Sequence, residues 1–286
     1  MRAISPPNLD IKTVYEACIN SITDDDLSTR LQNIMTNIIQ SSSDYGNKAL
    51  TNMLYTISPN HCDNDAIALG NVTKKELRAV YSSHFVPATK PARIYYDQLI
   101  SLAPLGKCPY CGVGYASTLD HYLPKNKFPQ LSVTPLNLIP SCKDCNTGKK
   151  TSFPSTSHEQ SLHPYYDHGN FIQDQWLHAN VIETTPATIE YCVIPPSQWN
   201  EDDKVRVHSH FNDFDLKTKY SIEASNQIAV LRDSLLYAWG TKGFVGVRQQ
   251  LMLDALAYYL KHPNSWQTAM YQSLAKSDWY CNGGFK

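Results

Sequence analysis

Eight cysteines are present among the 286 residues, and four of them form two C-x-x-C pairs. The first pair is Cys108 and Cys111, and the second is Cys142 and Cys145. Each such turn lets two thiolates converge on one ion, and four thiolates complete the closed tetrahedral shell of a structural zinc site. A thioredoxin-like redox pair is the alternative, but it needs a single C-x-x-C and leaves the second pair unexplained. We therefore expect these four cysteines to bind a structural zinc ion.

An Asp-His pair, Asp120 and His121, lies between the two cysteine pairs and opens the sequence Asp-His-x-x-Pro-Lys. Asn137 precedes the second cysteine pair, and Asn146 follows it directly. An Asp-His pair alone is a weak signal, because a histidine beside an acid is usually part of an ordinary hydrogen bond. The full order is much more specific, since a cysteine pair, the Asp-His segment, Asn-Leu, a second cysteine pair, Asn and Lys follow one another.

This order resembles the zinc-bound HNH endonuclease family, whose motif is a ββα finger, over residues 107–152. The resemblance implies that Asp120 holds a catalytic divalent ion and that His121 is the general base. It also implies that Asn137 braces the loop and orients the histidine, and that Asn146 is a further metal ligand at the start of the helix. The last motif position is often histidine, so this chain resembles an H-N-N variant of the family.

Phosphodiester hydrolysis gives a physical reason for these residue types. Histidine has an ordinary pKa of about 6.5, which suits the deprotonation of water near neutral pH. One carboxylate and one amide oxygen can hold Mg²⁺ or Mn²⁺ and leave positions open for phosphate and water. Neighbouring residues point to opposite sides of a regular strand. We therefore expect the strand that carries Asp120 and His121 to end or twist at that pair.

Lysines gather around the motif. Six lysines and two acids lie between residues 107 and 150, so this segment has a formal charge of +4, whereas the whole chain has −1. A locally basic segment suggests an anionic partner, although a solvated lysine face explains the charge equally well. The candidates for contact with nucleic-acid phosphates are Lys125, Lys127, Lys149 and Lys150.

His163 follows the motif within His-Pro-Tyr-Tyr-Asp. It is a candidate for supporting the catalytic residues or for touching the substrate. A structural loop histidine is the commoner case, and both interpretations stay open.

The sequence predicts an α+β fold, mostly helical, with a central zinc-stapled ββα finger. The expected regions are an N-terminal helical region at 1–104, the finger at 105–175, and a C-terminal lobe at 176–286. Capping residues and apolar spacing predict the helices, for example the Thr73-x-x-Glu76 capping box. A short hairpin is expected between Trp176 and Ile194, at the start of the C-terminal lobe.

The composition and the motif together favour a nuclease acting on nucleic acid, DNA rather than RNA. A non-catalytic four-cysteine module that binds nucleic acid or a protein is the alternative. With no apolar run of about 20 residues and no secretory signal, the expected location is the cytoplasm and no membrane partner is expected. The resemblance also implies a role in restriction or anti-phage (antiviral) defence, with a regulatory ATPase or another complex subunit as partner.

Overall fold

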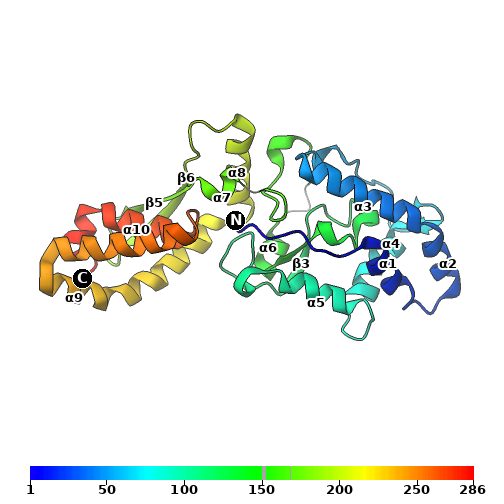
Figure 1. Cartoon of the computed structure of the whole chain (residues 1–286), viewed down its shortest axis with the longest axis horizontal. Helices are drawn as coiled ribbons and strands as arrows, with labels where there is room; N and C mark the ends of the chain where they lie inside the picture. Colours follow the sequence, from blue (N-terminus) through cyan, green and yellow to red (C-terminus); the bar gives the residue numbers. More distant parts are fainter. Residues whose placement is uncertain (150–152, 168) are drawn as a thin grey trace. The chain divides into compact units, whose positions relative to one another are not determined.

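The computed structural model describes residues 1–149, 153–167 and 169–286 (Figure 1). The chain forms two compact units, one of residues 2–166 and one of residues 167–286 together with Met1. No helix in the described parts of the chain is long and apolar enough to pass through a lipid bilayer. The three-region organisation expected from the sequence stays a prediction.

Helices build most of the first unit. They are α1 (Ile11–Ile19), α2 (Asp25–Asn33), α3 (Met35–Leu50), α4 (Lys74–Ala79) and α5 (Arg93–Ser101). The capping box predicted at Thr73 and Glu76 is present at the start of α4, where it follows the short hairpin of β1 (Ile67–Leu69) and β2 (Val72–Thr73). Such a cap typically stabilises a helix by about 1 kcal/mol. The helix boundaries are therefore set by local hydrogen bonds as well as by packing.

A hairpin and a short helix follow these elements in the same unit. Strand β3 (Thr118–His121) pairs antiparallel with β4 (Leu138–Ser141), and α6 (Lys143–Gly148) begins two residues after β4. These three elements are the ββα finger expected from the sequence. Strand β3 ends at His121, as the Asp-His pair requires.

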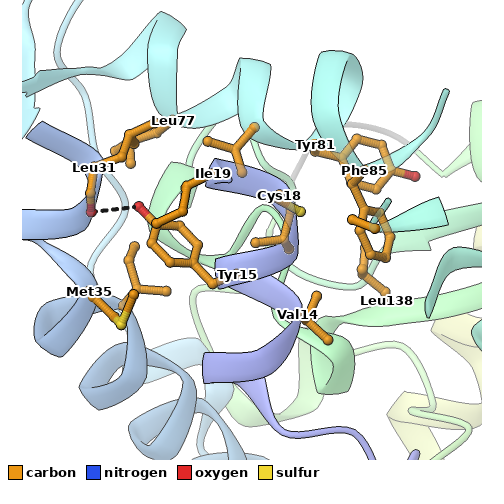
Figure 2. Close-up of a cluster of buried hydrophobic side chains, with 14 of the residues drawn as sticks. Val14, Tyr15, Cys18, Ile19, Leu31, Met35, Leu77, Tyr81, Phe85 and Leu138 are labelled. Atoms are coloured by element: carbon orange, nitrogen blue, oxygen red, sulfur yellow. Dashed lines mark hydrogen bonds between the residues drawn. The ribbon is translucent and has the colours of Figure 1, made fainter. Parts of the chain in front are cut away.

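The apolar core of the first unit joins the helices to this hairpin. Figure 2 shows the part around α1, where the hydroxyl of Tyr15 donates to the carbonyl oxygen of Leu31 at 3.1 Å. Leu119 of β3 and Leu138 of β4 are buried in the same cluster. Because alternate strand residues point to opposite faces, burial of Leu119 leaves Asp120 on the other face of β3. The helices thus fix the strand that carries the Asp-His pair.

The second unit combines one hairpin with further helices. Its elements are α7 (Asn170–Gln173), β5 (Leu177–Ile182), β6 (Thr188–Val193), α8 (Glu201–Asp213), α9 (Leu216–Lys261) and α10 (Trp266–Lys276). The antiparallel pair of β5 and β6 is the hairpin predicted between Trp176 and Ile194. Helix α9 is interrupted at Gly243, whose φ of +55° is costly for other residues. The chain is α+β and mostly helical, as expected.

Candidate functional site

The four cysteines of the two C-x-x-C pairs lie together. Their sulfur atoms are all within 4.8 Å of one another, and all four residues are buried. The Sγ atoms of Cys111 and Cys142 are 3.9 Å apart. Four thiolates bound to zinc at about 2.3 Å form a tetrahedron with edges of about 3.8 Å, so the cluster has the right size. These cysteines could hold a metal ion.

The backbone around the cysteines favours their charged, metal-binding form. Val113 directs its N–H to Cys111 Sγ at 3.5 Å, and Cys145 directs its N–H to Cys142 Sγ at 3.5 Å. Hydrogen bonds from N–H groups lower the cost of a thiolate. Gly114 lets the two cysteine pairs approach, since a Cβ there would lie 2.7 Å from the Cβ of Cys142.

The side chain of Asp120 extends from β3, and hydrogen bonds hold one of its two carboxylate oxygens. Its side chain is 7% exposed, and Oδ2 accepts hydrogen bonds from the Tyr110 hydroxyl at 2.9 Å and from Lys149 Nζ at 3.1 Å. Among the described residues, Oδ1 has no hydrogen-bond donor. The carboxylate is therefore oriented by one oxygen while the other remains available as a ligand.

His121 is held by the backbone of a neighbouring loop. Its Nε2 lies 2.8 Å from the carbonyl oxygen of Ser132. A carbonyl oxygen can only accept, so Nε2 carries the proton and Nδ1 has a lone pair. The ring also packs edge-on against Tyr81, with centroids 4.4 Å apart. Burial, and to a smaller extent the charge of Lys125, lowers the pKa of His121 to about 3. This pKa is below the ordinary histidine value on which the sequence-based expectation rested, so the imidazole is neutral near pH 7 and less basic than a free histidine.

Asn146 is oriented by a chain of hydrogen bonds on α6 and β3. Its Nδ2 donates to the hydroxyl oxygen of Thr118 at 3.0 Å and to the carbonyl oxygen of Leu119 at 3.3 Å. The Thr118 hydroxyl in turn donates to the carbonyl oxygen of Ser141 at 3.1 Å, so it must accept from Asn146. With the amide nitrogen bound in this way, Oδ1 is the end that faces away from β3.

Asp120, His121 and Asn146 meet at one open cavity of about 140 Å³. The other residues that line it are Pro124, Lys125, Asn126 and Lys149. The donor set fits a hard divalent ion, because a carboxylate oxygen and an amide oxygen are the ligands that Mg²⁺ and Mn²⁺ prefer. Three of the four predicted catalytic residues thus share one cavity.

Asn137, the fourth predicted catalytic residue, does not line this cavity. It is fully buried. Its Oδ1 accepts from Leu123 N at 2.7 Å, and its Nδ2 donates to the carbonyl oxygens of Leu123 and Leu131 at 3.1 and 3.3 Å. The side chain therefore ties the loop between β3 and β4 to the hairpin, while Ser132, on that loop, receives the hydrogen bond from His121.

The predicted lysines occupy different positions. Lys149 lies in the cavity wall, where it pairs with Asp120 and also donates to the carbonyl oxygen of Tyr122 at 2.8 Å. Lys125 lies over the ring of Tyr81 at 4.5 Å, and burial lowers its pKa. Lys127 is partly buried and is not part of the cavity wall. Lys150 lies outside the described residues.

His163 is placed in a buried aromatic cluster and is not part of the cavity wall. Its Nδ1 accepts from Tyr165 N at 3.2 Å, so Nε2 donates to the Tyr45 hydroxyl at 3.0 Å. Its ring centroid is 4.2 Å from that of Tyr122. These contacts place His163 among buried aromatic rings, and a role in supporting the catalytic residues stays a prediction.

Three further residues shape the site without having been predicted from the sequence: Tyr110, Ser132 and Tyr81. Tyr110 stands inside a C-x-x-C pair, and that position was the only available signal for it. Tyr81 lies on a helical face, where core packing is the common role of an aromatic residue. Ser132 acts through its backbone carbonyl, which no side-chain pattern reveals.

Comparisons with known proteins identify the family of this segment. Residues 108–152 match the family model described as HNH endonuclease. The chain is 33% identical over 258 residues to Protein ea31 of Escherichia phage lambda, an alignment that covers 86% of this chain and 87% of that protein. No solved structure matches the chain significantly.

Proposed function

Because the chain belongs to the family of the phage lambda protein ea31 and carries an HNH endonuclease domain at residues 108–152, we propose that it is a metal-dependent endonuclease. It hydrolyses phosphodiester bonds of nucleic acid. The observation that carries this proposal is the cavity shared by His121, Asp120 and Asn146. His121 and the two candidate oxygen ligands, Asp120 and Asn146, line one space that is open to solvent.

His121 is the general base of this reaction. Its Nδ1 takes the proton of the attacking water, while Nε2–H keeps its hydrogen bond to the Ser132 carbonyl. That carbonyl orients the ring and stabilises the imidazolium that forms. Asn137 supports the base indirectly, because it holds the loop that carries Ser132.

Asp120 and Asn146 would hold the catalytic divalent ion, Mg²⁺ or Mn²⁺, through side-chain oxygen atoms. When bound, such an ion would stabilise the charge that develops on the phosphate and on the leaving oxygen. Lys149 keeps Asp120 oriented, since it pairs with the opposite oxygen of the carboxylate. The roles of the protein groups are thus separate: one activates water, two bind the ion, and the remainder fix their positions.

The four cysteines bind zinc in a structural role. Four protein ligands leave no open coordination position, so this centre cannot activate water. Its contribution is to close the loop before β3 onto α6. A bound ion would add to the apolar contacts of the hairpin, where Leu119, Leu138 and Ile139 are buried.

The nucleic acid approaches over the lysine-rich segment. Lys125 lines the cavity directly and is the best placed for a phosphate next to the scissile bond. Lys127 and Lys149 contribute positive charge near it, and this charge attracts DNA and RNA without distinguishing sequence. Lys150, which lies outside the described residues, stays a candidate for phosphate contact. We expect DNA to be the preferred substrate, and the helical parts or a partner such as a regulatory ATPase to select the target in restriction or defence.

A cleavage assay on plasmid, single-stranded DNA and tRNA tests the proposal. Each substrate is incubated with Mg²⁺, with Mn²⁺ and with EDTA. The expected result is cleavage of DNA that needs added Mg²⁺ or Mn²⁺ and stops in EDTA. Binding of all substrates without cleavage under any of these conditions would show a non-catalytic four-cysteine module.

A further inference from the structure

Tyr110 connects the cysteine centre to the catalytic cavity. It stands between Cys108 and Cys111 in the first C-x-x-C pair, and its side chain is fully buried. Its hydroxyl donates to Asp120 Oδ2 at 2.9 Å. One residue of the cysteine loop therefore touches the carboxylate that we assign to the catalytic ion.

The contact selects which oxygen of Asp120 is available. Oδ2 is engaged by two donors from opposite ends of the finger, the Tyr110 hydroxyl and the Lys149 ammonium. The ammonium repels an approaching cation, whereas the neutral hydroxyl orients the carboxylate without adding charge. A carboxylate held in this way keeps Oδ1 without a competing donor among the described residues and would not have to reorient when an ion binds.

We propose that Tyr110 is a positioning residue that preorganises Asp120 for the catalytic ion and so couples that centre to the four-cysteine centre. This inference rests on the proposed function. The cysteines fix the loop, the loop fixes the ring of Tyr110, and the hydroxyl fixes Asp120. Hydrogen bonds from outside the metal shell of this kind commonly change metal affinity by about 10- to 100-fold when removed.

The variant Tyr110→Phe tests the inference, because it removes the hydroxyl and keeps the buried ring. Tyr15→Phe is the matched control: Tyr15 is also fully buried, and its hydroxyl donates to a backbone carbonyl in the helical core rather than to Asp120. Binding of Mn²⁺ is measured by the electron paramagnetic resonance signal of the free ion. Zinc content, thermal unfolding and plasmid cleavage against Mg²⁺ concentration are measured on the same samples.

We expect Tyr110→Phe to keep its zinc and to bind Mn²⁺ about 10- to 100-fold more weakly. Its cleavage should need correspondingly more Mg²⁺ and should approach the wild-type rate at saturation. Tyr15→Phe should lower the unfolding temperature with unchanged Mn²⁺ affinity. This split between metal affinity and maximal rate would not arise from a purely structural role.

Three results would overturn the inference. If Tyr110→Phe bound Mn²⁺ as tightly as the wild-type protein, the coupling would be absent while the nuclease proposal stood. Loss of zinc in Tyr110→Phe would mean that the hydroxyl serves the cysteine loop rather than Asp120. A wild-type protein that neither bound Mn²⁺ nor cleaved nucleic acid would remove the proposed function and the inference together.

Discussion

The two candidate metal-binding regions of the finger share one hairpin but differ in chemistry. The cysteine centre offers four buried sulfur atoms and no place for a further ligand. The cavity beside it offers oxygen donors from Asp120 and Asn146 and is open to solvent. Soft thiolates suit zinc, whereas hard oxygen donors suit Mg²⁺ or Mn²⁺. One short segment can therefore carry a closed centre for folding and an open centre for chemistry.

This difference shows how the open cavity depends on the cysteine centre. Although Leu119 and Leu138 of the hairpin are buried in the core of the first unit, Asp120 and Asn146 are polar groups that apolar packing alone does not orient. Their positions come from hydrogen bonds to groups that the cysteine centre and the helical core fix in turn. Substitutions in the cysteine centre should therefore impair folding, whereas substitutions in the open cavity should impair catalysis.

The largest effect is expected from Cys145→Ala. Structural zinc contributes on the order of 10–16 kcal/mol to the folding of small zinc-binding units. The variant should lose its zinc and the part of the protein's near-ultraviolet circular dichroism that comes from the tyrosines of residues 2–166. Cys62→Ala is the control, because Cys62 is only partly buried and lies outside the cluster. A Cys145→Ala protein with wild-type unfolding behaviour would contradict the structural role.

A smaller effect on stability is expected from Asn137→Ala. The substitution leaves the amide and the carbonyl group of Leu123 without a partner in a buried place, whereas the carbonyl oxygen of Leu131 keeps its hydrogen bond from the N–H of Thr134. Each such buried group costs about 1–3 kcal/mol, so the two groups of Leu123 together predict a loss of roughly 2–6 kcal/mol in chemical denaturation. Zinc should remain bound. An unchanged free energy of unfolding would show that the loop is held in another way.

The variant Asn146→Ala should affect the open centre while leaving the closed one intact. We expect the variant to need at least about tenfold more Mg²⁺ for half-maximal cleavage, since one of two protein ligands is removed. Asn146→His should regain activity with Mn²⁺ more than with Mg²⁺, because imidazole suits transition metals. Thr147→Ala, an exposed change on the same helix, is the control. Equal Mg²⁺ requirements in Asn146→Ala and the wild-type protein would exclude Asn146 as a ligand.

The smallest effect concerns the helical core, which needs no metal. Glu76 is bound by Arg30, and that hydrogen bond lowers the pKa of Glu76 from 4.5 to about 2. A depressed carboxyl pKa stabilises the fold above the unfolded-state pKa, and the gain is lost as the pH falls towards 2. The stability difference between wild type and Glu76→Gln should be constant near neutral pH and shrink below about pH 4.5.

Thermal unfolding at a series of pH values measures this difference. Glutamine also fits a capping box, so the substitution isolates the charge. Glu16→Gln is the control, because Glu16 forms only an exposed contact with Lys12. A Glu76→Gln difference that grew on acidification would contradict the assigned ion pair. Such a result would also mean that a titratable group other than Glu76 controls how the stability of this region changes with pH.

The sequence was most informative where chemistry imposes spacing. Thiolates that share one ion must come in closely spaced pairs, so the cysteine cluster could be predicted without coordinates. The capping box at Thr73 and the hairpin of β5 and β6 were predictable for a similar reason, since local hydrogen bonds and alternation leave short patterns.

The contacts that hold the catalytic residues in place could not be predicted from the sequence. Tyr110 donates a hydrogen bond to Asp120 across the finger, and the backbone carbonyl oxygen of Ser132 accepts a hydrogen bond from His121. Neither contact has a fixed sequence spacing. The pairing of Lys149 with Asp120 was likewise not expected, because its position after the motif indicated phosphate contact. Contacts that depend on tertiary folding leave no local pattern.

The most direct test of the account is plasmid cleavage by His121→Ala beside the wild-type protein and His61→Ala. His61 is an exposed histidine that is not part of the cavity wall, so its removal should leave the rate unchanged. Loss of a general base should slow cleavage by about 10²- to 10⁴-fold at saturating Mg²⁺ while zinc content and unfolding temperature stay at their wild-type values. Cleavage by His121→Ala at the wild-type rate, in a folded and zinc-loaded protein, would contradict the assignment of His121 as the base.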